Sequence, residues 1–472
     1  MLGRAPVFLP GKLESMLVLE AMADDTIAAV ATAVAPGQGS VAIVRLSGPQ
    51  AEAIGRRLFV APGHQPWESH RVLYGHVVDP GTGERVDEAL LLLMQAPRSF
   101  TREDVVELHC HGGLICVQRV LELVLAAGAR RAEPGEFSQR AFLNGRLDLT
   151  RAEAISELIT ARSRRAAQLA IAGLDGGLQR RITALRERLL DQLAELEARV
   201  DFEEDLPPLD PALVTAELRA VRSALEQLLA DAAQGQLLRE GLRVAIVGRP
   251  NVGKSSLLNR LSRSERAIVT DLPGTTRDLV ESELVLEGVP LTLLDTAGIR
   301  ATEDQVERIG IERSRAALQA ADAVLLLFDL TVGWTAEDQA LAALVPEGVP
   351  LLRVGNKADQ LDPTAAPVAG ADVRVSALSG EGQAQLVEAL LRCCGRSEAQ
   401  GLLVALNGRQ RDLAARAASG LTASLEAADQ QLPWDFWTID LRAAVRALGE
   451  ITGAEVSEAV LDRVFARFCI GK

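Results

Sequence analysis

The hydrophobic pattern along the chain begins with short apolar runs separated by Pro/Gly turns. Between residues 26 and 113 these runs predict strands at Val41–Leu46, Ala89–Met94 and Val105–Cys110, within a mixed α/β region. From Thr150 the apolar residues recur at helical spacing in an Ala-, Leu-, Arg- and Glu-rich region. Thr150-Arg151-Ala152-Glu153 has the pattern of a capping box and predicts the start of the first helix there.

The helical pattern is interrupted once by an alternation of strands and helices. Gly173–Gly177 is expected to break the first helical run, and a further helix is expected to end near Asp231. Residues 241–395 then alternate strand and helix, and Asn407–Asp429 and Asp440–Phe468 return to amphipathic helix. Helix therefore flanks the alternating region on both sides, which indicates an inserted domain.

This pattern predicts a multidomain α/β protein. We expect an N-terminal α+β domain at 22–143, an all-α domain formed by 144–240 and 396–472, and an inserted α/β domain at 241–395. Residues 1–21 are expected to be a dispensable extension, because Met22 is a more natural beginning. A length of 472 residues agrees with about three domains.

Composition excludes several classes of protein. The formal net charge of −14 argues against nucleic-acid binding over the whole surface, although a local basic site remains compatible with it. No run of about 18 uncharged apolar residues is present, so no membrane span is predicted. The five cysteines follow no repeated metal or disulfide spacing, which favours a reducing, cytoplasmic location.

A phosphate-binding loop follows the predicted strand Leu242–Val247. Gly248–Ser255 is a complete G-x-x-x-x-G-K-S motif, and Ser256–Leu261 reads as the helix after it. Backbone N–H groups of such a loop point at phosphates, and the helix dipole favours the anion. Lys254 is expected to neutralise the β- and γ-phosphates, and the Ser255 hydroxyl to bind Mg²⁺.

Further motifs at strand ends indicate a guanine nucleotide. Asp295–Gly298 follows an apolar strand, where an aspartate approaches Mg²⁺ and a glycine N–H meets the γ-phosphate. Asn356–Asp359 follows Leu351–Val354, and a carboxylate there accepts both N–H donors of the guanine edge. Ser376–Leu378 is expected to close over the base. The chain has only four lysines. Two of them, Lys254 and Lys357, belong to these motifs and are expected to have a role in this site.

The loop Thr270–Asp278 is expected to be a switch that orders around Mg²⁺, with Thr276 as the second hydroxyl ligand. Ile299 occupies the position where a Ras-like protein has the glutamine that orients water, so catalysis requires another group. The complete set of predicted GTP-binding residues is Asn251, Val252, Gly253, Lys254, Ser255, Ser256, Thr270, Asp271, Leu272, Pro273, Gly274, Thr275, Thr276, Asp295, Thr296, Ala297, Gly298, Asn356, Lys357, Ala358, Asp359, Ser376, Ala377 and Leu378.

Two weaker patterns admit two interpretations each. His109-Cys110-His111 places both imidazoles on one face of a strand, but without further ligands a packed or ligand-contacting pair is favoured over a metal site. The arginines at 162, 164, 165, 180 and 181 could contact RNA, although a solvated helical face is the simpler interpretation.

Several segments outside the nucleotide motifs resemble the MnmE/TrmE family, the tRNA wobble-uridine modification GTPases. The resemblance is carried by Val106–Gly113, by Pro134–Asn144 and by the tail Phe468–Lys472, which is similar to the C-terminal Cys-Ile-Gly-Lys signature of the family. It covers essentially residues 22–472. The resemblance implies a folate-binding N-terminal domain that dimerises, a discontinuous helical domain and an inserted Ras-like G domain.

The resemblance also implies a reaction and partners. The family acts with a flavin-dependent protein of the MnmG/GidA type, in a heterotetramer, to install an aminomethyl or carboxymethylaminomethyl group at carbon 5 of uridine 34 in certain tRNAs. A 5-formyl- or 5,10-methylene-tetrahydrofolate would supply the one-carbon unit, and glycine or ammonium the amine. GTP is the substrate of the G domain, with Mg²⁺ and K⁺ as its ions.

Individual residues match functional positions of the family. Asn251 matches the asparagine that binds K⁺, with the carbonyls of Thr270, Leu272 and Thr275, and Glu307 matches the glutamate that positions water. Arg45, Glu107, Arg146 and Lys472 match the folate contacts, with Arg146 replacing a lysine of relatives. The place of Cys469 in the tail signature makes it a candidate reactive thiol, although such a thiol is more often only packed or exposed.

Two alternatives remain open at this point. The G motifs alone fit a ribosome-assembly GTPase equally well, but residues 22–145 and the tail argue against it. The second alternative is a folate-dependent aminomethyl transferase with an accessory G domain.

Overall fold

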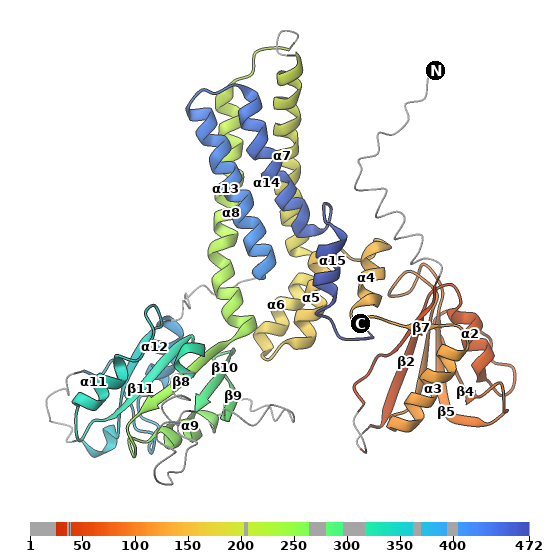
Figure 1. The fold of residues 1–472 in the computed structure, drawn as a ribbon, viewed down its shortest axis with the longest axis horizontal. Helices are drawn as coiled ribbons and strands as arrows, with labels where there is room; N and C mark the ends of the chain where they lie inside the picture. Colours follow the sequence, from red (N-terminus) through yellow and green to blue (C-terminus); the bar gives the residue numbers. More distant parts are fainter. Residues whose placement is uncertain are drawn as a thin grey trace. The chain divides into compact units, whose positions relative to one another are not determined.

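The protein is described here by a computed structural model that covers residues 25–34, 37, 39–202, 206–263, 280–295, 317–361, 370–393 and 405–471. The chain divides into two compact units. The first unit comprises residues 1–156, 179–186 and 448–472, and the second comprises 157–178 and 187–447. Both contain a sheet and helices (Figure 1).

The first unit contains a seven-stranded sheet in the order β3-β4-β5-β6-β2-β1-β7. Neighbouring strands are antiparallel except β1 and β7, which are parallel. The three strands predicted from the sequence are confirmed as β2, β5 and β6. The strands are β1 (Ile27–Val30), β2 (Val41–Ser47), β3 (Phe59–Val60), β4 (Arg71–Val78), β5 (Arg85–Met94), β6 (Val105–His111) and β7 (Arg130–Arg131).

Helices α2 (Ala51–Leu58) and α3 (Leu114–Ala126) cover this sheet, because alternate strand residues and one side of each helix form a single hydrophobic core. On β2 and β6 that core takes Val44 and Leu108 among others. Side chains alternate along a strand, so the intervening residues lie on the opposite face. Arg45 of β2 is directly opposite Glu107 of β6 in the register, and this pair lies on the face away from the core.

Three helices of the first unit pack near the C-terminal tail. They are α4 (Glu136–Leu143), α5 (Leu149–Thr160) and α15 (Glu458–Phe465), and Leu149, Ala152 and Phe465 share one core. The predicted capping box at Thr150 is wrong. Asp148 caps α5 instead, since its Oδ1 accepts from Arg151 N at 3.1 Å and from the Thr150 hydroxyl.

The second unit contains a six-stranded sheet in the order β13-β12-β11-β8-β10-β9. All neighbours are parallel except β9 and β10, which form a hairpin. The strands expected before the P-loop and before the other nucleotide motifs are confirmed. The elements are β8 (Leu242–Gly248), α9 (Lys254–Ser262), β9 (Val280–Leu286), β10 (Val289–Asp295), β11 (Ala323–Asp329), α11 (Ala336–Ala342), β12 (Leu351–Asn356), η2 (Ala358–Gln360), β13 (Val373–Arg374) and α12 (Gln383–Cys393).

Long helices adjoin this sheet in the sequence on both sides. Helices α8 and α13 lie side by side (Figure 1). None of the helices in the described ranges combines the length and the apolar character needed to cross a bilayer. The helices are α6 (Arg164–Leu174), α7 (Gly177–Phe202), α8 (Pro211–Glu240), α13 (Gly408–Asp429) and α14 (Trp434–Thr452).

Several helix boundaries differ from the sequence prediction. The expected break at Gly173–Gly177 is confirmed, but α8 continues to Glu240 rather than ending near Asp231. The reason is packing, because Leu237 and Leu238 of its last turns enter the core of the second sheet. Helix α14 begins at Trp434 rather than Asp440, and residues 453–457 separate it from α15.

Candidate functional site

The P-loop turns at two glycines, and a side chain at either position would displace neighbouring atoms. Gly248 has φ 153°, and a Cβ there would lie 2.3 Å from Leu327 O. Gly253, at the start of α9, has φ 97°, and its Cβ would lie 2.2 Å from Asn356 Nδ2. Both therefore require the freedom of glycine. The loop closes on itself through Lys254 Nζ, which donates to Gly248 O at 2.6 Å and to Arg249 O at 2.8 Å.

Asn356 joins the P-loop to the two base-recognition segments. Its side chain is almost fully buried, its Nδ2 donates to Val252 O at 2.8 Å, and its Oδ1 accepts from Ala377 N at 3.0 Å. Asp359 accepts from the Ser376 hydroxyl at 2.5 Å. Three segments far apart in the sequence are thus hydrogen-bonded together at the carboxyl ends of β8, β12 and β13, where open α/β sheets bind ligands.

Two carboxylates outside the predicted motifs hold basic residues of this site. Lys357, with φ 66°, donates from Nζ to Asp329 Oδ2 at 2.6 Å. Burial raises the pKa of Asp329, but its hydrogen bonds with Lys357 and Thr331 outweigh burial and lower it overall. Arg249 of the P-loop pairs with the fully buried Asp338 at 2.9 Å. Asp329 is the last residue of β11 and Asp338 lies in the first turn of α11, and neither position is a strong signal in a sequence.

The remaining nucleotide residues are placed only in part. Asn251 is exposed with φ 61°, and Ser255 and Ser256 are exposed at the start of α9. Leu378 is 80% exposed. Asp295 is the last residue of β10, and its side chain is not described. The following expected residues lie outside the described ranges: Thr270, Asp271, Leu272, Pro273, Gly274, Thr275, Thr276, Thr296, Ala297, Gly298 and Glu307.

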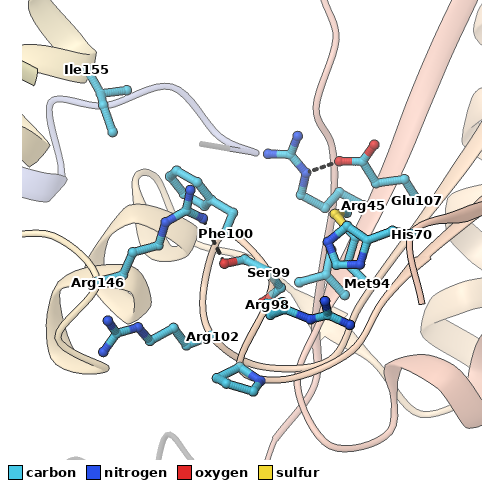
Figure 2. Close-up of a pocket in the computed structure, with 12 residues that line it drawn as sticks. Arg45, His70, Met94, Arg98, Ser99, Phe100, Arg102, Glu107, Arg146 and Ile155 are labelled. Atoms are coloured by element: carbon cyan, nitrogen blue, oxygen red, sulfur yellow. Dashed lines mark hydrogen bonds and ion pairs between the residues drawn. The ribbon is translucent and has the colours of Figure 1, made fainter.

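A second candidate site is a pocket of about 750 Å³ in the first unit (Figure 2). Arg45, Glu107 and Arg146, three of the four residues expected to contact folate, line it. Arg45 Nε donates to Glu107 Oε1 at 2.8 Å, as their cross-strand register allows. Lys472, the fourth expected contact, lies outside the described residues.

Glu107 supplies a buried negative charge to this pocket. Burial raises its pKa, but hydrogen bonds from His109 and Arg45 and the charge of Arg45 outweigh burial and hold the pKa below its ordinary 4.5. The carboxyl is therefore ionised at neutral pH and can accept N–H donors from a ligand. On the other side Arg146 Nη1 donates to Ser99 O at 2.7 Å, and its guanidinium lies over the Phe100 ring.

The C-terminal tail lies beside this pocket. Ile470 forms a β-bridge with Pro134, and Arg45 Nη1 donates to Gly471 O at 3.1 Å. Cys469 is exposed, and its carbonyl accepts from Gly135 N at 3.4 Å. The C-terminal tail and the Pro134–Asn144 segment, which both carry the family resemblance, are therefore in contact.

The His109-Cys110-His111 segment does not form a metal site among the residues that the structure describes. His109 Nε2 lies 3.0 Å from Glu107 Oε2, and His111 Nδ1 lies 2.7 Å from Asp87 Oδ1. Of the arginines considered for RNA, Arg162 pairs with Glu283 at 2.9 Å.

Sequence reasoning missed several residues of the pocket. Arg98, Phe100 and Arg102 come from the loop between β5 and β6, and His70 from the residue before β4. The sequence shows two arginines in a loop between two predicted strands. This pattern points to a binding site only once the fold shows that the loop lines a pocket.

The chain matches known families along nearly its whole length. Residues 26–146 match the GTP-binding protein TrmE N-terminus, and residues 149–469 match the MnmE helical domain. The protein named tRNA modification GTPase MnmE from Synechococcus sp. (strain RCC307) is 72% identical over 450 residues, which are 95% of this chain and 99% of the relative. The protein of the same name from Prochlorococcus marinus (strain MIT 9303) is 68% identical over 456 residues, 95% of this chain and 98% of the relative.

Among solved structures, Aquifex aeolicus Era bound to GDP and aluminium fluoride is 28% identical and covers 39% of this chain and 67% of its own, with a TM-score of 0.27, too low to support an inference. The two family matches and the identity to full-length relatives are sufficient to assign the family. This chain belongs to the MnmE/TrmE family.

Proposed function

We propose that the protein is a K⁺-activated GTP hydrolase that acts with a flavin-dependent partner of the MnmG/GidA type. Together they would add an aminomethyl or carboxymethylaminomethyl group to carbon 5 of uridine 34 in certain tRNAs. Membership of the family makes the chain a GTPase of tRNA modification. Activation by K⁺, the flavin-dependent partner and the identity of the modified nucleoside go beyond family membership and are what we propose.

One observation carries the nucleotide part of the proposal. Asn356 bonds both to the P-loop and to the segment that follows β13, so phosphate and base recognition belong to one hydrogen-bonded unit. Asp359 would accept the two N–H donors of guanine, and the exposed N-terminus of α9 would receive the phosphates. Arg249 and Lys357 are held in place for this by Asp338 and Asp329.

Two ions are proposed for the phosphate end of the site. Ser255, exposed at the start of α9, fits a Mg²⁺ ligand, with Thr276 as the second hydroxyl. Asn251 has no hydrogen-bond partner for its side chain among the described residues, so its amide oxygen is available to a K⁺ ion, with the carbonyls of Thr270, Leu272 and Thr275. K⁺ would supply positive charge beside the phosphates, and Glu307 would orient the attacking water.

The pocket of the first unit fits a tetrahydrofolate derivative, the proposed one-carbon donor. The ionised Glu107 suits the N–H donors of a pteridine ring, and Arg45 fixes that carboxylate. A volume of about 750 Å³ is within the range of small-molecule sites. Cys469 and Gly471 belong to the tail beside Arg45, and Cys469 remains the candidate reactive thiol. Lys472 remains a proposed folate contact.

Assembly as a homodimer through the N-terminal domain is also proposed. Val72 and Tyr74 on β4 and Leu90 on the adjacent β5 are 58%, 46% and 42% exposed, and together they form an apolar area on the sheet. The proposed domains are 22–143, 144–240 with 396–472, and 241–395. We propose a cytoplasmic location, where free thiols such as Cys110 persist.

The experiment for this mechanism is GTP turnover in KCl and in NaCl at equal ionic strength. The wild type should be strongly faster in KCl, and Asn251→Ala should lose that difference while still binding GDP. Asn259→Ala, in the exposed face of α9, is the matched control and should keep the preference for KCl. Equal turnover of the wild type in both salts would remove K⁺ from the proposal and leave the GTPase assignment intact.

A further inference from the structure

Charge is distributed unequally in the pocket of the first unit. Arg45 and Glu107 form an ion pair on one side, so their charges compensate. Arg98, Arg102 and Arg146 have no carboxylate partner among the described residues. We call these three residues the arginine rim. Arg102 donates to the backbone oxygen of Asn144 and Arg146 to that of Ser99, and these neutral partners leave both charges uncompensated.

Two residues of the arginine rim, Arg102 and Arg146, are held in place although their charges repel. Burial, together with the nearby positive charge of Arg102, lowers the pKa of Arg146. Arg102 has φ 62°, a backbone conformation that costs free energy for a residue other than glycine. Both of its neighbours in the chain are fixed by other contacts, since the buried Thr101 hydroxyl bonds with Ser47 and Glu103 is bonded to Arg140. A ligand with several negative charges would relieve the repulsion.

We propose that Arg98 and Arg102, together with Arg146, form a subsite for the anionic tail of the folate and select folates that carry more than one γ-linked glutamate. This inference rests on the proposed folate function of the pocket. A folate with one glutamate has two carboxylates at that end, and each further glutamate adds one. The lining of the pocket suits such a molecule, because the ionised Glu107 would accept from the N–H donors of the ring and Arg98, Arg102 and Arg146 would pair with carboxylates of the tail.

The geometry favours a folate tail over an RNA phosphate as the anion. Arg98, Arg102 and Arg146 line the same cavity as Glu107, so a single small ligand would contact these arginines and the carboxylate together. An RNA backbone has a series of phosphates, so binding it would require a row of basic residues that extends beyond this cavity. The folate tail is therefore the occupant that we assign, and RNA binding is an outcome of the test.

The experiment compares the dissociation constants of the full chain for 5-formyl-tetrahydrofolate with one glutamate and with three. Measured by calorimetry at low salt, the wild type should bind the triglutamate roughly five- to tenfold more tightly, because two added carboxylates meet exposed arginines. The double variant Arg98→Gln/Arg102→Gln should bind both ligands within about twofold of each other. The preference of the wild type should also decrease as salt is added, since exposed charges are screened.

The matched control is Arg57→Gln/Arg85→Gln, which removes the same charge from exposed positions of the same sheet unit outside the pocket. It should keep the triglutamate preference, and circular dichroism should show both double variants folded. Equal affinity of the wild type for the two ligands would overturn the subsite and leave the folate proposal standing. Failure of the wild type to bind either ligand would instead reject the folate function itself. Loss of tRNA affinity in Arg98→Gln/Arg102→Gln with an unchanged triglutamate preference would assign the rim to RNA.

Discussion

Asn356 Nδ2 donates to Val252 O at 2.8 Å, and this bond connects the base-recognition segment to the P-loop. The same side chain accepts from Ala377 N, so one buried amide positions three loops of the nucleotide site. One residue of the predicted GTP-binding set therefore also holds the loops of the site together.

Replacing Asn356 by alanine should weaken nucleotide binding and stability together. Val252 O and Ala377 N would lose their partners, and each such loss costs about 1–3 kcal/mol. GDP affinity, measured with a fluorescent analogue, should fall at least about tenfold. Asn407→Ala removes the capping side chain of α13 and is the control, because it should lower the melting temperature without changing GDP affinity. Unchanged GDP affinity in Asn356→Ala would contradict this role.

Asp359→Asn should change the preferred base from guanine to xanthine. Guanine offers two N–H donors to a carboxylate, whereas an asparagine amide presents one donor and one acceptor, which suits the additional carbonyl of xanthine. Losing one hydrogen bond and the negative charge that strengthens the other should lower GTP affinity about 100-fold. Competition between GTP and XTP measures the change. Asp372→Asn, whose carboxylate pairs with Arg353 elsewhere on the sheet, should leave the preference as it is.

His111 should titrate above its ordinary pKa. The hydrogen bond with Asp87, at 2.7 Å, and the charge of Asp87 raise the pKa of His111 above 6.5. Because the folded-state pKa is raised, the stabilisation from this pair is fully present below 6.5 and is lost as pH rises through the raised value. Selectively labelled histidine spectra, in which there are only five side chains to assign, should show this. In Asp87→Asn the pKa of His111 should move down toward its ordinary value, and an identical titration in both proteins would rule the pairing out.

Thiol reactivity should separate the four cysteines that the structure describes into two groups. Burial, assisted by Asp87, raises the pKa of Cys110 to about 11 and that of Cys116 to about 12, so neither is appreciably a thiolate at neutral pH. Cys393 and Cys469 are exposed. Brief alkylation followed by peptide mapping should therefore modify Cys393 and Cys469 well before Cys110 and Cys116, and all should react after unfolding. Alkylation of Cys110 as fast as Cys469 would contradict the burial argument.

Local sequence patterns correctly predicted the strands that precede the nucleotide motifs, because these motifs sit at strand ends and have fixed spacing. The P-loop, Asn356 and Ser376 all occupy the expected ends of β8, β12 and β13. The cap of α5 was mispredicted because Thr150 and Glu153 satisfy the capping-box pattern, while Asp148 lies two residues earlier and accepts from Arg151 N, so that the helix already includes Thr150.

Features that depend on tertiary packing could not be predicted in this way. The last turns of α8 persist because Leu237 and Leu238 enter the core of a distant sheet. Asp329 and Asp338 acquire their roles only when the fold brings them to Lys357 and Arg249. The arginine rim likewise exists only once the β5–β6 loop faces Glu107.

The central claim is that this GTPase modifies the wobble uridine, and nucleoside analysis of tRNA tests it most directly. Total tRNA would be compared from a deletion strain and from that strain carrying the wild-type gene or Asn356→Ala. The account predicts that the deletion loses 5-aminomethyl or 5-carboxymethylaminomethyl nucleosides at position 34, that the wild type restores them, and that Asn356→Ala does not. A nucleoside profile unchanged by the deletion would contradict it.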